Sequence, residues 1–311
     1  MYEQKIDLPH SLCGALLVDK PEGISSFDVI RQIRRLYNTK KVGHCGTLDP
    51  FASGVMVLLF GEATKIAAYL TEEDKRYQGI FKLGITTDTG DREGQTTKQI
   101  LADHCTLLQV QEVAHSLIGK MDQQPPRYSA QKINGQRAYV LARQGRDFET
   151  RARTIEVFKL GILQALGHQQ YGFECHVSKG TYVRTLIEAI GERLLVGAHV
   201  ISLRRIASGN LGIERTHTLE SLQNKTKEQR FNAIEPVYSI WGNNPSIVLD
   251  EDSQKQIRLG RAVIAPKNAS VQAHDPVVLA FDGNQNPVAL GFWQPHAASD
   301  TYLFQPQRVF K

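Results

Sequence analysis

Strand-type and helix-type segments alternate along residues 14–206 without forming a regular βαβ repeat. Short apolar or alternating runs predict strands at 14–18, 55–60, 77–84, 155–166, 171–177 and 200–206. Apolar residues at helical spacing, two of them after capping residues, predict helices at 26–37, 64–70, 107–118 and 181–195. This irregular order favours an α/β or α+β domain built on a mixed sheet.

A second, smaller unit follows a linker at residues 241–245. The chain has 311 residues, enough for about two domains. Beyond the linker, a helix at 250–259 ends at Gly260, and Asp282-Gly283-Asn284 separates two short strands as a hairpin turn would. We therefore expect a main domain at 1–244 and a small β-barrel at 245–311, a size more typical of an accessory binding module than of an active site.

Several classes of protein are disfavoured by composition. Apolar residues make up 41% and charged residues 22%, which is enough to bury a sizeable core. No apolar run approaches the roughly 20 residues of a membrane span, and residues 1–10 lack a signal-peptide core. The four cysteines are isolated, without a CxxC pair or zinc-type spacing. We expect a reduced, cytoplasmic protein with no membrane segment, disulfide framework or metal site.

The positive charge is concentrated in one part of the chain. Lys and Arg number 37 against 32 Asp and Glu, a net charge of +5. Residues 127–159 hold eight basic and three acidic residues, a net 8 − 3 = +5, whereas residues 246–311 hold six of each. A concentrated basic surface attracts polyanions, because each neutralised phosphate releases a counterion. A solvated charged face would have the same composition, so both alternatives stay open here.

Residues 38–54 contain the densest set of reactive side chains. Four glycine or proline residues and no periodicity predict a loop, which holds His44, Cys45 and Asp49. Asp49 could be a nucleophile or a general base, although Asp-Pro is more typical of a turn whose carboxylate accepts nearby amides. No sequence feature pairs Cys45 with a base. No GK[ST] follows the glycines, which excludes a Walker A loop.

This loop resembles the signature of the TruB family, the tRNA pseudouridine-55 synthases of bacteria. The matching residues are GHCGTLDP at 43–50, Gly54 and GEATK at 61–65. Further blocks follow in the family's order, at 17–25, 124–143, 178–186 and 197–205. Cys45 departs from the usual Thr, a small-for-small change that we expect to be harmless. The chain from about Ser246 resembles the family's PUA-type RNA-binding module only loosely.

The resemblance implies a fold and a reaction. It implies a pseudouridine-synthase-type mixed sheet with flanking helices in a catalytic domain at 1–244, an RNA-gripping insert at about 122–152, and a PUA-like β-barrel at 245–311. It also implies isomerisation of uridine 55 in the T-arm of tRNA, with no cofactor and no metal. We expect a cytoplasmic monomer that needs no protein partner.

Three catalytic residues are implied by the match. Asp49 is the nucleophile that holds ribose C1′ or uracil C6 while the base turns. Arg184 pairs with it, since a lone carboxylate in a dry pocket would take up a proton. Tyr77 stacks on the target base near its C5 proton. By pattern alone, Arg184 would equally suit a helix surface, and Tyr77 would suit the core at a strand edge.

Five further residues are implied to bind the substrate. Tyr182 and Leu203 line the uracil pocket, and His44 helps to extrude the nucleotide from its stack. Lys20 and Lys65 contact phosphate or brace the loop. Core packing, a surface histidine and solvated lysines are the corresponding structural alternatives. Flipping a base costs a few kcal/mol, which stacking and the basic insert would offset.

Two other functions are compatible with parts of the sequence. The guide-RNA-dependent relatives of archaea and eukaryotes share the Gly-Thr-Leu-Asp loop, but the long insert around 124–148 favours the stand-alone type. A tRNA-binding or tRNA-folding protein without catalysis would not require Asp49, so the set of Asp49, Tyr77 and Arg184 argues against it.

Overall fold

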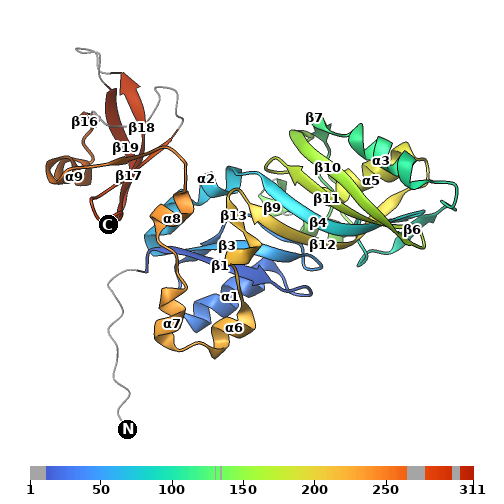
Figure 1. Cartoon of the computed structure of the whole chain (residues 1–311), viewed down its shortest axis with the longest axis horizontal. Coiled ribbons are helices and arrows are strands. Elements are labelled where there is room, and N and C mark those ends of the chain that lie inside the picture. The colour runs from blue at the N-terminus through green and yellow to red at the C-terminus, as the bar shows by residue number, and fades with distance from the viewer. Residues whose placement is uncertain (1–11, 130, 134, 265–276, 296–301) are drawn as a thin grey trace, which may run out of the picture.

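The computed structural model describes residues 12–129, 131–133, 135–264, 277–295 and 302–311. A ten-stranded sheet crosses the molecule, and a five-stranded sheet lies at the C-terminal end (Figure 1). Eight strands of the large sheet run in the order β14 (His217–Thr218), β1 (Gly14–Lys20), β3 (Ser53–Phe60), β12 (Ala198–Ser208), β4 (Lys75–Leu83), β11 (Gln170–Val177), β10 (Arg153–Gly167) and β7 (Gly119–Gln123). Two short strands lie off this path, β2 (Val42–His44) beside β3 and β13 (Leu211–Gly212) beside β12. The β1–β14 and β3–β12 pairs are parallel and the others antiparallel, so the predicted mixed sheet is confirmed.

Two helices cover one face of the sheet beside β1 and β3, namely α1 (Ser26–Leu36) and α6 (Leu219–Asn224). The predicted capping box starts α1: the Ser25 hydroxyl accepts the N–H of Asp28, whose carboxylate accepts the N–H of Ser25. Val29 and Ile33 of α1 then pack on apolar side chains of both strands.

The other half of the sheet carries α3 (Leu107–His115) and α5 (Val183–Arg193). Thr106 caps α3, as its position before the apolar pattern predicts. Ile187 and Ile190 of α5 are buried against the sheet, which fixes the orientation of the helix. The first turn of α5 thereby faces the loop that precedes β3.

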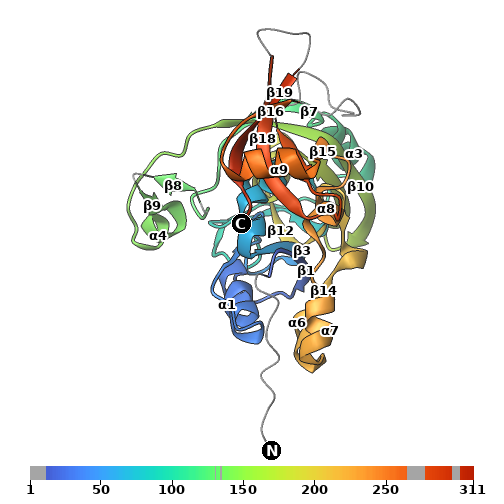
Figure 2. The ribbon, with the colours of Figure 1, turned by 90° about the vertical axis from the view of Figure 1, so that its left-hand side faces the viewer.

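Some elements differ from the sequence predictions. The predicted loop at 38–54 contains β2 and the start of β3, and the predicted helix at 64–70 is a 3₁₀ turn followed by α2 (Ala67–Glu72). The hairpin of β5 (Ile85–Thr87) and β6 (Thr96–Gln99) was not expected, nor were α6 and the two short helices α7 (Lys227–Asn232) and α8 (Val237–Trp241). The insert holds β8 (Lys132–Ile133), β9 (Gln136–Arg137) and α4 (Ala138–Arg143), and it stands to one side of the sheet (Figure 2).

The C-terminal unit is a curled sheet that fits a PUA-like module. Its strand order is β15 (Ser246–Val248), β17 (Val278–Phe281), β18 (Pro287–Pro295), β19 (Tyr302–Val309) and β16 (Val263–Ile264), with α9 (Glu251–Arg258) beside it. The predicted hairpin is present between β17 and β18, and the Asp282 carboxylate accepts the N–H groups of Asn284 and Asn286 at 2.9 and 2.8 Å. As predicted, α9 ends before Gly260, which has a φ of 78°.

The core under this module is continuous with the core of the main sheet. Phe281 and Phe310 belong to the same buried cluster as Leu17, Val57 and Trp241. The linker predicted at 241–245 is therefore bridged by apolar packing, although the module also has a buried cluster of its own that includes Val278 and Phe304.

Candidate active site

A cavity of about 470 Å³ opens between the β2–β3 loop, the centre of the sheet and the first turn of α5. It is lined by all three residues predicted to be catalytic and by two of those predicted to bind substrate, namely Asp49, Tyr77, Arg184, Tyr182 and Leu203. The first and last of these residues, Asp49 and Leu203, are 203 − 49 = 154 positions apart in the chain, and the sheet brings them together.

The loop that carries Asp49 is fixed to the start of α1. The Ser26 hydroxyl donates to the carbonyl of Leu48 and accepts its N–H group, both at 2.8 Å. The carbonyl of Asp49 accepts the N–H of Ala52 at 3.1 Å, so the backbone makes the turn that Asp-Pro predicts. The side chain is free of that turn, because its Oδ2 lies 2.9 Å from Nε of Arg184.

Arg184 is buried and held on several sides. Its side chain is 3% exposed, against 36% for Asp49, so the carboxylate is the member of the pair that faces the cavity. Its guanidinium donates to the carbonyls of Thr89 and Tyr128 at 2.6 and 2.9 Å, and lies 3.5 Å from the Asp91 carboxylate. Arg184 is therefore a fixed cation beneath Asp49 and not a helix-surface residue.

Burial and neighbouring charges act in opposite directions on Asp49. Burial raises the pKa of its carboxyl, the Arg184 guanidinium lowers it, and the nearby Asp91 raises it again. On the next turn of α5, burial likewise raises the pKa of Glu188, to about 7, with Arg184 opposing. The buried guanidinium of Arg184 thus acts on three acids, Asp49, Asp91 and Glu188. The ionised form of Asp49 depends on this guanidinium.

Tyr77 forms one wall of the cavity, from near the start of β4. It is opposite Arg205 of β12 and Cys175 of β11 in the sheet register. Burial raises the pKa of its phenol, while the charge of Arg205 and a side-chain hydrogen bond from it oppose the rise. The phenol is neutral at pH 7, with its ring on the cavity surface.

Sequence reasoning missed Arg205, which is fully buried behind the loop. Its Nε donates to the carbonyl of Val55 at 2.7 Å, and a terminal nitrogen donates to the carbonyl of Gly46 at 3.2 Å. The backbone of β12 passes so close to Gly54 that a Cβ there would lie 2.2 Å from the Arg205 carbonyl. The sequence did contain a signal for a buried arginine. Adjacent residues of a strand point to opposite faces of the sheet, so either Arg204 or Arg205 had to point inward.

Two further residues of the site also escaped prediction. Lys75 is buried in the cavity wall, and burial, reinforced by Arg205, lowers its pKa to about 8. The Gln123 carboxamide accepts the N–H of Tyr182 at 2.7 Å and donates to its carbonyl at 3.0 Å. This clamp fixes the backbone from which Tyr182 reaches the cavity.

The structure places Lys20 behind the loop and not on the cavity surface. Its fully buried ammonium donates to the carbonyls of Pro21 and Ile24, each at 2.8 Å, and of Pro50 at 3.2 Å. Burial lowers its pKa to about 8. These contacts suit the loop-bracing alternative, because the three carbonyls occupy its donors.

His44 and Lys65 also lie outside the cavity lining. His44 ends β2 half-buried, and burial, with Arg205, lowers its pKa. Lys65 lies at the C-terminal module, where it donates to the carbonyl of Val309 at 2.5 Å and stands 5.4 Å from the ring centroid of Phe310. Lys65 thus connects the signature segment to the end of the chain.

Other reactive groups offer no competing centre. Cys45 is fully buried, and burial raises its pKa to about 12, so it is a neutral thiol. Within the described ranges, no group of three or more His, Cys, Asp or Glu side chains could hold a metal ion. Among the helices of the same ranges, none is long and apolar enough to cross a membrane.

Comparison with known proteins identifies the family. The family model described as "TruB family pseudouridylate synthase (N terminal domain)" matches residues 34–183, and "tRNA pseudouridylate synthase B C-terminal domain" matches residues 184–239. A tRNA pseudouridine synthase B of Syntrophotalea carbinolica is 40% identical over 96% of this chain and 97% of that protein. Another, from Enterobacter sp. (strain 638), is 42% identical over 72% of this chain and 70% of that protein.

Solved structures agree on the fold. A Cbf5–Nop10–Gar1 complex contains a chain with a TM-score of 0.75 and 25% identity, covering 99% of this chain and 91% of that one. The chain of an H/ACA RNP bound to a substrate RNA has a TM-score of 0.74 at 23% identity, covering 96% and 85%. Since its two family domains adjoin and one relative is 40% identical to it over nearly the whole length, the chain belongs to the TruB family of pseudouridylate synthases.

Proposed function

We propose that this protein isomerises uridine 55 in the T-arm of tRNA to pseudouridine, with Asp49 as the nucleophile. The observation that carries the proposal is the ion pair of Asp49 with buried Arg184 on a cavity that Tyr77 also lines. The named relatives, tRNA pseudouridine synthases B, support tRNA as the substrate.

The reaction breaks the N-glycosidic bond, turns the base and joins uracil C5 to ribose C1′. In one route Asp49 bonds to C1′ and the bond pair passes to N1; in the other it adds to C6 and holds the base. Both routes end with the carboxylate released, the C5 proton lost and N1 protonated. Arg184 keeps Asp49 ionised for the attack. No electron acceptor or carrier group enters this balance.

The remaining cavity residues would hold the flipped base. Tyr77 stacks on uracil. Because its phenol is neutral at pH 7, it can accept the C5 proton only after giving up its own proton, and the Arg205 guanidinium beside it favours that loss. Tyr182 and Leu203 close the pocket around the ring. We assign Lys20 and Lys65 to bracing, as their contacts suggest, and keep His44 as a residue that aids extrusion of the nucleotide.

The insert at about 122–152 would grip the RNA beside this cavity. Arg143, Arg146 and Arg151 are exposed on it, and Figure 2 shows it standing away from the sheet. In this proposal residues 1–244 form the catalytic unit and 245–311 an RNA-binding module. We expect a cytoplasmic monomer that acts without a protein partner.

The test is to map pseudouridine base by base on an unmodified tRNA transcript exposed to the purified protein alone. We expect conversion at position 55. Conversion that requires an added guide RNA would support the guide-dependent alternative. Tight binding without conversion would support a tRNA-binding or tRNA-folding protein. Asp49→Asn is the matched variant and should bind tRNA within about tenfold of wild type while converting none of it.

A further inference from the structure

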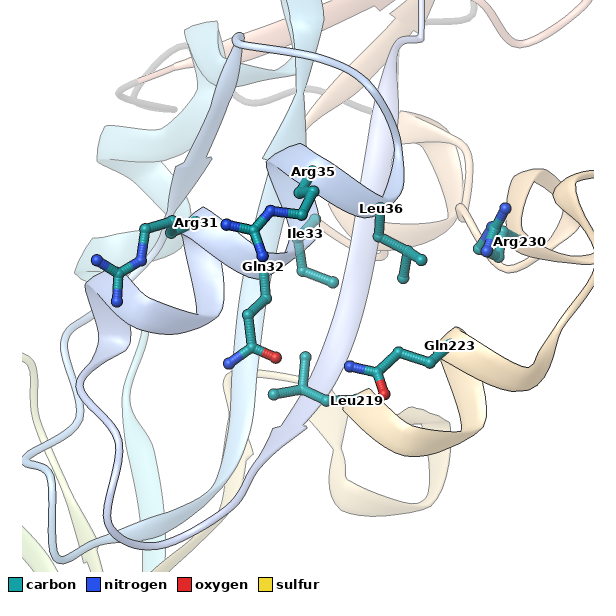
Figure 3. Close-up of a pocket in the computed structure, with 8 residues that line it drawn as sticks. All are labelled: Arg31, Gln32, Ile33, Arg35, Leu36, Leu219, Gln223 and Arg230. Carbon is teal, nitrogen blue, oxygen red and sulfur yellow. The ribbon is translucent and has the colours of Figure 1, made fainter.

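A second hollow, distinct from the catalytic cavity, lies between α1 and the helices α6 and α7. It has a volume of about 650 Å³ and shares no lining residue with the catalytic cavity. Figure 3 shows Arg31 and Arg35 along its α1 side and Arg230 on the opposite side. Gln32 and Gln223 point their amide groups toward one another across it. We call this hollow the arginine groove.

The arginine groove is positively charged and has no acid in its lining. Three of its eight residues are arginines, two are glutamines and three are apolar, namely Ile33, Leu36 and Leu219. Arg31 is paired with Asp28 of its own helix at 2.5 Å. Within the described ranges, neither Arg35 nor Arg230 has a carboxylate at ion-pair distance. Two guanidinium groups thus face the groove without a counter-charge.

The sequence around the groove strengthens this charge. Residues 28–48 contain five Lys or Arg residues and one acid, Asp28, which pairs with Arg31; Lys41, another of the five, pairs with Glu62. Arg34, one of the five, donates to the carbonyl of Val42 at 2.9 Å. A carbonyl is neutral, so this hydrogen bond does not cancel the positive charge of Arg34. A cluster of like charges destabilises the free protein, so its presence on one surface favours an anionic ligand.

We propose that the arginine groove binds the phosphate backbone of the RNA substrate, as a second contact away from the flipped base. Planar guanidinium groups match phosphate oxygens in a bidentate manner, and amide groups such as those of Gln32 and Gln223 bond ribose hydroxyls. This inference rests on the proposed function, which supplies a polyanionic substrate. Among the described residues the lining contains no aromatic residue, whereas the centres of protein–protein interfaces are enriched in them, so it favours RNA over a protein partner.

The groove lies within reach of an RNA bound at Asp49. Ser26, at the start of α1, is bonded to Leu48 in the catalytic loop, and Arg35 follows it by nine residues on the same helix. At a rise of 1.5 Å per residue, that is a separation of about 13 Å along the helix axis. A folded tRNA is far larger than this, so one molecule can occupy both sites.

The experiment compares two double variants of the full chain, Arg35→Gln/Arg230→Gln and the control Lys98→Gln/Lys120→Gln. Both remove two positive charges, and the control lysines are exposed and line neither cavity. The dissociation constant for a full-length tRNA transcript is measured over a range of salt. We expect the arginine variant to weaken binding roughly tenfold and to make the slope of log affinity against log salt shallower by about 1 to 2, while the control changes neither.

Equal weakening by both variants would overturn the proposal, because it would show a general effect of net charge. Unchanged binding in the arginine variant would also overturn the proposal. An acidic protein would then be the alternative ligand of the groove. Thermal melts check folding. If the double variant melts early, Arg35→Gln alone, on an exposed side chain, should still give about half of the change in slope. The readout is binding, so a failure to form pseudouridine would refute the proposed function without affecting this comparison.

Discussion

The catalytic cavity and the junction with the C-terminal module each hold an acid beside basic groups, with opposite results. At the junction, hydrogen bonds from Lys41 and Lys65 lower the pKa of Glu62 to about 2. In the cavity, burial raises the pKa of Asp49 although Arg184 is 2.9 Å away. The charge of Glu62 therefore stabilises the fold, whereas the charge of Asp49 is kept at a cost in stability.

The packing around Glu62 and the packing around Asp49 differ in the same way. At the junction the ion pairs of Glu62 lie beside a continuous apolar core that includes Phe281 and Phe310, and Lys41 is exposed. The cavity instead exposes part of Asp49 above a buried cation. A site that must bind and react keeps a charged group incompletely satisfied, and the rest of the fold supplies the stability that this requires.

The largest effect on activity, after loss of Asp49 itself, should come from Arg184→Gln. The amide keeps some hydrogen bonding but removes the cation that opposes the raised pKa of Asp49. We expect turnover to fall by about 10²- to 10³-fold, the usual effect of losing one electrostatic partner of a reacting group. The measurement is single-turnover pseudouridine formation at saturating enzyme. A loss below threefold would show that Asp49 does not depend on this pair.

At the junction, Phe310→Ala should destabilise the whole chain and not the module alone. The side chain is buried in the shared cluster, and Phe→Ala changes in cores cost about 3–5 kcal/mol. Chemical denaturation should show a single transition at lower denaturant. Two separate transitions, with the catalytic unit unaffected, would show that the two cores are energetically independent.

Glu62→Gln should reduce stability in a pH-dependent way. Because the folded pKa of about 2 lies below the ordinary 4.5, the carboxylate contributes stability above pH 4.5 that is lost as the pH falls toward 2. We expect a deficit of about 2 kcal/mol at pH 7, smaller than the full shift implies because its partner Lys41 is 55% exposed and solvent screens the pair. Thermal melts of wild type and variant should converge near pH 2–3. A constant difference would assign the effect to packing.

The smallest effect on the folded state is expected at the insert, in the triple variant Arg143→Gln/Arg146→Gln/Arg151→Gln. These side chains are exposed, so the unfolding free energy should change by less than about 1 kcal/mol. The slope of log affinity for tRNA against log salt should nevertheless become shallower, by up to about 0.9 per lost phosphate contact. An unchanged slope would show that the insert is a solvated charged face and does not contact the RNA phosphates.

The sequence predicted elements well where local signals were strong. The capping residues Ser25 and Thr106 and the turn at Asp282 mark boundaries that the structure confirms. It missed α6, α7 and α8, which are five or six residues long and too short for a reliable apolar period. Their positions depend on packing against distant segments, which no local pattern encodes: α6 and α8 contact β1, and Phe231 of α7 packs on Tyr37.

The sequence predicted some residues of the candidate active site and missed others, because only some of them have a local signal. Asp49 stands in a glycine-rich loop, and the family resemblance named its partners Tyr77 and Arg184. Arg205 and Gln123 act through backbone carbonyls and amides of distant segments, and such partners are known only once strands are in register. Sequence reasoning identifies reactive side chains more readily than the residues that position them.

The most direct test of this account measures activity and stability together in Asp49→Asn. Because burial raises the pKa of Asp49, its charge lowers stability at pH 7, and Arg184 retains Asp91 at 3.5 Å when that charge is removed. We predict no detectable pseudouridine on tRNA and an unfolding free energy equal to or above that of wild type. Conversion by the variant, or a loss of stability like that expected for Glu62→Gln, would contradict the account.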